Sequence, residues 1–392
     1  MTDELQKLNY TFSRRSFLKL FSISLLGGHA AACSHKKFFN PDEDIVLSGG
    51  SFSKSDKLQN ALVIINLLQK DKKVIETDFL PHGICINPNN KYSVFCVEKN
   101  GINACEIDLQ EQSVIRTIQT EQNKLFSGHA SFSVDGKKII CIEKDKGNYQ
   151  GSITIRHTDT FEIIQRLPTL GLSPHDCQLD TDNILTVSNT GRSESGFHQP
   201  SLVRINLDTG KLVERIKLDT DDLNCGHFIS TKNNELVIAS APVNDKDKDK
   251  DKDKIFSGGV SIRNINENMT TMTEPAEVIK HMTGEALSIE VDERRLVAAV
   301  THPEANLLTF WSIKDKRLLK VYAFENPRGL SKTLDKKYFI VSYGNNAAME
   351  YISTNDLSPQ TDSIVQPTHA SGEHILNWSK TLHEIMPERI YD

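Results

Sequence analysis

The 392-residue sequence lacks several features by which large classes of protein are recognised. Its N-terminal apolar run, Leu20 to Leu26, is interrupted by Gly27 and Gly28 and is too short for a permanent membrane-spanning helix. It has no basic stripe and no interleaving of aromatic with basic residues, and its formal net charge is −6, so nucleic acid is not an expected partner. GxSxG, Walker, HExxH and CxxC motifs are absent, so no motif indicates a hydrolase nucleophile, a nucleotide-binding loop or a cysteine-based metal site.

What the sequence contains instead is a repeat. A glycine or proline followed by His, Glu or Arg recurs at intervals of 47, 46, 52, 58, 43 and 45 residues. The longest interval contains 244–254, a mostly alternating Asp-Lys stretch that predicts a solvated loop. A period in this range, filled with short strands and no helices, is typical of a β-propeller. Each of these dipeptides marks the start of a repeat and is called a restart. The second residues of the restarts are His82, His129, His175, His227, Glu285, Arg328 and Glu373.

The strand and turn pattern predicts an all-β, seven-bladed β-propeller whose ring is closed by strands from both termini. Six blades lie between His82 and Pro367, and the seventh would pair an inner strand at 374–378 with N-terminal strands at 45–51, 61–67 and 73–79. Sharing one blade closes the ring and leaves no open sheet edge. The expected organisation is a signal segment at 1–33, a linker at 34–44, one propeller domain at 45–380 and a C-terminal tail at 381–392.

The N-terminal segment predicts export and lipid attachment. Residues 13–19, SRRSFLK, match a twin-arginine signal, and three alanines precede Cys33 as in a lipoprotein cleavage site. We expect a monomeric periplasmic protein that begins at a lipidated Cys33 and contacts the membrane through that anchor alone. The alternative is an ordinary signal peptide that is cut near Ala32.

Six cysteines follow Cys33 in the sequence. An oxidising compartment permits disulfides, but four of these cysteines lie inside predicted strands beside Val, Ile and Phe. We therefore expect mostly buried free thiols. The four are Cys85, Cys96, Cys105 and Cys141.

The restart positions predict a ring of side chains around the central channel, because the first strand of each blade lines the axis of a propeller. Imidazole nitrogens are natural ligands of iron, copper and zinc, so the four histidines are candidate metal ligands, with iron or copper as the candidate ion. Alternatively, each histidine is structural and bonds an aspartate in the turn of its own blade, Asp135 for His129 and Asp182 for His175. The full set of ligand candidates is His82, His129, His175, His227, Glu285, Arg328, Glu373 and His374.

A second group of polar residues follows the second strand of several blades. These loops return to the face that carries the histidines, so we expect a polar rim around the channel mouth. Arg192 and Arg328 could attract an anion such as a carboxylate there. The alternative is that these loops are polar only because they are exposed. The rim candidates are Glu98, Glu143, Asn189, Arg192, His302 and Asn345.

Several strings carry a family resemblance: Gly128-His129, FSVDGK at 132–137, GLSPHD at 171–176, SNTG at 188–191 and LDTG at 207–210. With these strings the chain resembles a bacterial family of exported propellers, the domain-of-unknown-function 1513 family, over roughly residues 58 to 378. The family has Glu where this chain has Asp176 and Gly where it has Thr190. The resemblance implies a gene neighbourhood shared with imelysin-type iron-regulated periplasmic proteins, and hence a role in periplasmic iron handling.

These observations leave three functional hypotheses. The first is a non-enzymatic, lipid-anchored propeller that binds a metal or a partner protein in iron acquisition, with imelysin-like proteins as candidate partners. The second is a docking scaffold whose histidines are purely structural. The third is a metal-dependent propeller enzyme, lactonase-like or redox.

Overall fold

The computed structural model describes residues 37–243 and 257–391, and one compact unit begins at Phe39 and includes the rest of the chain. The twin-arginine signal, Cys33 and the Asp-Lys stretch at 244–254 lie outside the described residues. Neither helix of the described part has the length and apolar character needed to cross a membrane.

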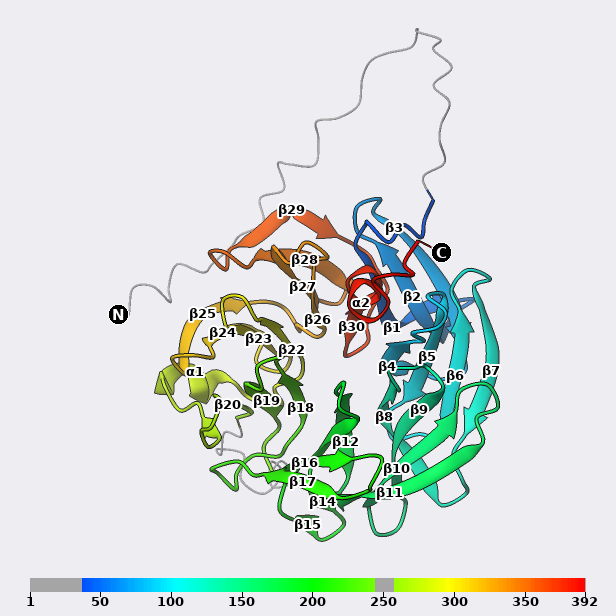
Figure 1. Ribbon diagram of the computed structural model, residues 1–392. Helices are drawn as coiled ribbons and strands as arrows, with labels where there is room; N and C mark the ends of the chain where they lie inside the picture. The colour runs from blue at the N-terminus through cyan, green and yellow to red at the C-terminus, as the bar shows by residue number, and fades with distance from the viewer. Residues whose placement is uncertain (1–36, 244–256, 392) are drawn as a thin grey trace, which may run out of the picture. The chain divides into compact units, whose positions relative to one another are not determined.

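Seven four-stranded antiparallel sheets form a ring, which confirms the predicted seven-bladed propeller (Figure 1). From the inner to the outer strand, the first two blades are β4 (Pro81–Ile86), β5 (Ser93–Glu98), β6 (Asn103–Asp108), β7 (Ser113–Gln119), and β8 (Lys124–Phe132), β9 (Lys138–Asp145), β10 (Gln150–His157), β11 (Ile163–Leu172). The third and fourth are β12 (Pro174–Leu179), β13 (Ile184–Asn189), β16 (Ser201–Asn206), β17 (Leu212–Ile216), and β18 (His227–Ser230), β19 (Leu236–Ser240), β20 (Gly259–Arg263), β21 (Thr270–Thr271). The fifth and sixth are β22 (Ile289–Asp292), β23 (Val297–His302), β24 (Leu307–Ser312), β25 (Arg317–Ala323), and β26 (Leu330–Lys332), β27 (Tyr338–Tyr343), β28 (Ala348–Ser353), β29 (Pro359–Val365). A small hairpin, β14 (Arg192–Ser193) with β15 (Gly196–Phe197), projects from the third blade.

The seventh blade joins the two ends of the fold, as predicted. Its strands are β30 (Ile375–Asn377), β1 (Ile45–Lys54), β2 (Lys57–Asn66) and β3 (Asp71–Thr77). Val46 lies opposite Asn377 and Ser48 opposite Ile375 in the antiparallel ladder. Because β30 is the innermost strand of this sheet, the last segment of the chain completes the lining of the axis.

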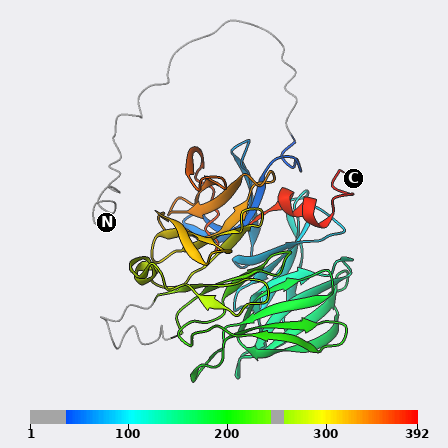
Figure 2. The same cartoon turned by 60° about the vertical axis from the view of Figure 1, so that its left-hand side comes forward.

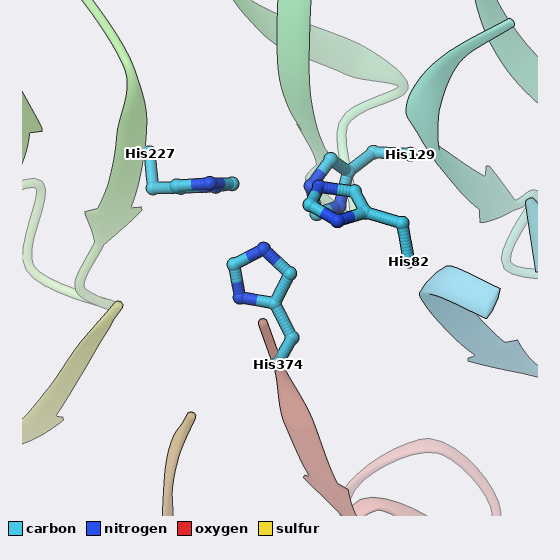
Figure 3. Close-up of side chains that lie close together, drawn as sticks. All are labelled: His82, His129, His227 and His374. Carbon is cyan, nitrogen blue, oxygen red and sulfur yellow. The ribbon is translucent and has the colours of Figure 1, made fainter. Parts of the chain in front are cut away.

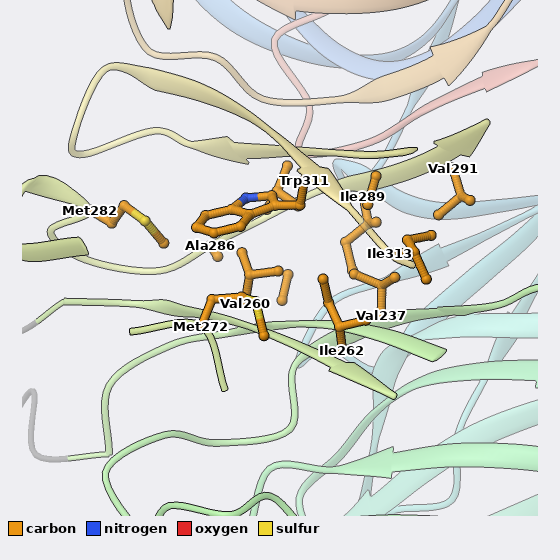
Figure 4. Packing of buried hydrophobic residues seen from close by; sticks show 13 residues of the cluster. Val237, Val260, Ile262, Met272, Met282, Ala286, Ile289, Val291, Trp311 and Ile313 are labelled. Atoms are coloured by element: carbon orange, nitrogen blue, oxygen red, sulfur yellow. The ribbon is translucent and has the colours of Figure 1, made fainter. Parts of the chain in front are cut away.

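Apolar side chains of neighbouring blades pack face to face and hold the ring together. Figure 4 shows one such cluster, in which Val237 and Ile262 of the fourth blade lie with Val291 and Trp311 of the fifth. Trp311 is fully buried, and its indole nitrogen donates a hydrogen bond to the Thr309 hydroxyl. Burial on both faces explains why the second strands read as continuous apolar runs rather than as alternating ones.

Two helices were not predicted. The chain forms α1 (Ala276–His281) in the connection between the fourth and fifth blades and α2 (Trp378–Ile385) directly after β30. The expected inner strand at 374–378 therefore ends at Asn377, whose side chain caps α2 by accepting a hydrogen bond from the Lys380 amide. In Figures 1 and 2, α2 lies beside the seventh blade, and it contacts β1, β30 and β4.

The cysteines of the described residues are free, and Cys96, Cys105, Cys141 and Cys225 are buried, as expected for most of them. Cys85 and Cys177 are half-buried.

Candidate metal centre

Five histidines from five different blades meet at the centre of the ring. They are called the histidine cluster below and are His82, His129, His175, His227 and His374. The shortest distances between ring centroids are 4.3 Å, for His175 with His227 and for His227 with His374. Figure 3 shows four of the imidazoles, those of His82, His129, His227 and His374, directed toward a common point. One nitrogen from each of these four lies within 4.8 Å of the others.

β-Bulges in the inner strands orient three of these side chains. The strand register shifts between Pro81 and Gly83 in β4, between Phe126 and Ala130 in β8, and between Pro174 and Cys177 in β12. His82, His129 and His175 lie within these three shifts. A bulge turns a side chain out of the regular alternation of the strand, and here it turns the imidazoles to the axis.

Gly128 leaves room for this arrangement. Its φ is +116°, a conformation that residues with a side chain rarely adopt, and a Cβ atom there would lie 2.5 Å from Cδ2 of His82. Residue 128 is therefore glycine because a side chain there would collide with the imidazole of His82 in the preceding blade.

Two carboxylates face the outer nitrogens of the cluster. Nδ1 of His82 lies 3.2 Å from Oε2 of Glu373, and the Nδ1 atoms of His129 and His227 lie 3.5 Å from Oδ1 and Oδ2 of Asp176. A carboxylate beside Nδ1 favours the tautomer that carries its proton there, which leaves Nε2 with a free lone pair. This carboxylate–imidazole pattern accompanies most histidines that bind metals in proteins.

The inner nitrogens of three histidines have no partner. Nε2 of His82, of His129 and of His374 is buried and makes no hydrogen bond with a described residue. Nε2 of His175 and Nε2 of His227 lie 2.8 Å apart, so one ring donates to the other. Buried polar atoms normally have a partner, so three orphaned nitrogens at one point need a physical explanation.

The turn aspartates proposed for a structural role do not contact these histidines. Asp135 instead accepts hydrogen bonds from the Ser133 hydroxyl and the Lys137 amide in its own turn. The nearest carboxylate to His129 comes from Asp176 in the next blade.

Burial keeps four imidazoles of the cluster uncharged. It holds the pKa values of His82, His175 and His374 well below the ordinary value of 6.5, and neighbouring positive groups lower them further. The pKa of His129 falls to about 4, because burial outweighs the opposing effect of Asp176. Neutral imidazoles are the form that coordinates metal ions.

Cations hold Glu373 in its charged form. Burial alone would raise its pKa, but the nearby Lys99 ammonium and Arg328 guanidinium outweigh that effect and lower it. The Lys99 ammonium donates a hydrogen bond of 2.6 Å to Oε2 of Glu373, and Arg328 lies 3.8 Å from Oε1. Arg328 thus occupies the predicted ring as a partner of Glu373, and its charge also lowers the pKa of His374.

Glu285 does not belong to the group of side chains whose ligand atoms converge at the centre of the ring. The inner strand of its blade begins at Ile289 rather than at the predicted residue 286, so Glu285 is not the residue directly before a strand. Its side chain instead lines a pocket beside His175 and His227.

Three of the rim candidates do not form an exposed rim, and that prediction is corrected here. Glu143, Asn189 and His302 are fully buried. Glu143 accepts a hydrogen bond of 2.9 Å from Arg156 on the next strand, and Asn189 accepts one of 2.8 Å from the Thr169 hydroxyl. They are the last or nearly the last residues of second strands, where neighbouring strands still cover them.

The other rim candidates lie nearer the surface. Glu98 is half-buried and accepts hydrogen bonds from the backbone and side chain of Asn103. Asn345 is exposed and donates to Glu325, and Arg192 is exposed and lines the pocket that Glu285 also lines.

The sequence prediction placed Lys99 only in the rim loop at 98–100 and assigned no role to Asp176, and the structure places both residues around the cluster. Both were visible in principle, since Asp176 follows His175 and Lys99 follows Glu98. Their roles depend on neighbouring blades, which the spacing of one repeat does not reveal.

Comparison with known proteins identifies a family and a fold. A family model described as "Protein of unknown function (DUF1513)" matches residues 80–375, and no curated protein matches the chain. Among solved structures, hydrazine synthase from Kuenenia stuttgartiensis aligns with a TM-score of 0.61 at 12% identity and covers 84% of this chain and 99% of that one. A hypothetical selenium-binding protein from Sulfolobus tokodaii aligns with 0.61 at 11% identity over 84% and 92%, and dihydro-heme d1 dehydrogenase NirN with 0.57 at 13% over 88% and 77%. At these identities the likeness shows the propeller fold alone.

Proposed function

The chain belongs to the DUF1513 family, a family of unknown function, and we propose from the geometry of its centre that it binds a transition-metal ion through the histidine cluster. Nitrogens of His82, His129, His227 and His374 would hold the ion, with His175 as a fifth imidazole at its edge. The ion proposed is iron or copper, which neutral imidazole binds well.

One observation carries this proposal: the imidazoles of His82 and His129 present an unpartnered, buried Nε2 toward the centre while a carboxylate faces their Nδ1. A purely structural histidine would use both nitrogens within the protein. An ion at the centre would satisfy these atoms together and would offset the free-energy cost of leaving them unpaired.

The spacing of the nitrogens is close to what a single ion requires. Two nitrogens that each lie about 2.0–2.1 Å from one ion are at most about 4.2 Å apart. The four nitrogens lie within 4.8 Å of one another, so small side-chain rotations would bring them to one ion.

We further propose that this metal binding serves iron acquisition in the periplasm, where the protein is a lipid-anchored monomer rather than an enzyme. The twin-arginine string at 13–19 and the alanines before Cys33 support export and anchoring. The family resemblance supports a link to iron handling and to imelysin-like partners. The twin-arginine route, which exports folded proteins, is consistent with a metal that is bound before export.

The test is the metal content of the protein after native export, purified with a tag that contains no histidine. Mass spectrometry is expected to find about one equivalent of iron or copper per chain. The double variant His129→Ala/His227→Ala is expected to lose it while keeping the fold. His302→Ala is the matched control, because His302 is also buried but lies outside the cluster.

Two results would overturn the proposal. One is wild-type protein that stays free of metal after native export and after reconstitution with iron and copper salts. The other is a double variant that retains wild-type metal content. Either result would favour the docking scaffold, whereas bound metal with turnover of a lactone or redox substrate would favour the enzyme hypothesis.

A further inference from the structure

A pocket with an excess of positive charge adjoins the histidine cluster. It has a volume of about 320 Å³, and His175 and His227 form part of its wall. Three cationic side chains line it, those of Lys99, Lys144 and Arg192. We call it the cationic pocket.

The cations are only partly neutralised. Glu285 is the one carboxylate among the described residues that line the pocket. With Glu373, the partner of Lys99, two negative charges face three positive ones and leave an excess of one. Lys99 already pairs with Glu373, at 2.6 Å. The Lys144 ammonium donates to the neutral side-chain oxygen of Asn100, and the Arg192 guanidinium has no hydrogen bond or ion pair with a described residue.

These positive groups influence one another. Burial lowers the pKa of Lys144, and the charges of Arg192 and Lys99 lower it further. Like charges gathered at a partly buried site cost free energy unless an anion lies between them. The arrangement therefore favours a negatively charged ligand.

The metal site narrows the class of anion. An arginine and lysines bind carboxylates through short charge-assisted hydrogen bonds, and carboxylate oxygens are also good ligands for iron. A pocket of this volume suits a small organic molecule rather than a macromolecule. A ligand held here would present its oxygens beside His175 and His227.

We propose that the cationic pocket binds a small organic anion with two or three carboxylate groups, an inference that rests on the proposed metal site because histidines of the cluster form the pocket wall. Such an anion has two sources. It is either a free carboxylate that contacts only the protein or a carboxylate that is bound to the ion as its chelator.

The experiment is calorimetric titration of the full mature protein with citrate as the probe, once stripped of metal and once loaded. Wild-type protein is expected to bind citrate, and Arg192→Gln and Lys144→Gln are expected to weaken binding by about tenfold or more. Arg317→Gln, which removes an exposed arginine that does not line the pocket, is the matched control. Tighter citrate binding by the loaded protein identifies a metal-bound carboxylate, whereas equal binding identifies a free one.

Metal content measured without citrate separates this inference from the proposed function. Wild-type metal content with no citrate binding in either state would overturn the pocket assignment and leave the metal site intact. Citrate binding by a wild-type protein that never holds metal would support the pocket and overturn the metal site. Inorganic phosphate that binds as tightly as citrate would overturn the carboxylate class.

Discussion

Nδ1 of His82 lies 3.2 Å from Oε2 of Glu373, which joins the first complete blade to the segment just before the last inner strand. This contact connects ring closure to the proposed metal site, because Glu373 precedes His374 and β30. Closing the propeller thus delivers both an imidazole and the carboxylate that orients another imidazole.

Glu373→Gln should weaken metal binding by about 10- to 100-fold, because the amide no longer favours the proton on Nδ1 of His82. Competition with a chelator of known affinity measures the change. Glu121→Gln, which removes a carboxylate of similar size from an exposed ion pair, should leave the affinity unchanged. An affinity equal to that of the wild type in Glu373→Gln would show that Glu373 does not act on the cluster.

Much of this fold was predictable, because its signals are local. The restarts at positions such as His129 and His175 repeat along the chain, and the unused N-terminal strands indicated the shared blade. The site was only partly predictable. The spacing predicted a ring that holds four histidines, but it did not reveal the bulges that turn them, which form between strands of one blade. It also did not reveal Asp176, which faces His129 from the next blade.

The rim prediction failed for a related reason. Glu143 is a polar residue near the end of a strand, and its local sequence reads as an exposed loop. Its burial depends on Arg156, which reaches it from the neighbouring strand. Neither the spacing nor the composition of one strand contains that partner.

Gly128→Ala should destabilise the protein by at least about 2 kcal/mol and lower its metal content. The substitution forces a side chain into a backbone conformation with φ of +116° and places Cβ 2.5 Å from the His82 ring. Urea unfolding and metal analysis measure the two effects. Gly147→Ala is the control, because a Cβ at Gly147 meets no atom within 4 Å; equal behaviour of the two variants would contradict the prediction.

Trp378→Ala should lower the free energy of unfolding by about 3–5 kcal/mol. The Trp378 side chain is fully buried, and its indole nitrogen donates a 2.7 Å hydrogen bond to the Lys91 carbonyl, which fastens α2 to the first blade. Ile385→Ala, at an exposed position of the same helix, should cost less than about 1 kcal/mol. Similar losses for both variants in urea unfolding would mean that α2 does not fasten the ring.

Cys33→Ala should move the protein from the membrane fraction to the soluble periplasm, because the lipid is its proposed anchor. Replacing Arg14 and Arg15 with Lys should instead block export, so that the protein stays in the cytoplasm. Fractionation followed by immunoblotting distinguishes the three locations. A Cys33→Ala protein that remains with the membrane would show that the anchor lies elsewhere.

Stability should fall as the pH falls below about 6.5, in part because of His302. Burial lowers the pKa of His302 to about 3, so between pH 6.5 and 3 the unfolded chain binds a proton that the folded protein does not. Over that window the free energy of unfolding decreases with falling pH, by about 2 kcal/mol from this residue alone between pH 6.5 and 5. His302→Gln should make the dependence shallower by that amount in urea unfolding series at several pH values, whatever its effect at pH 7. An unchanged slope in His302→Gln would show that this imidazole is not held neutral by the fold.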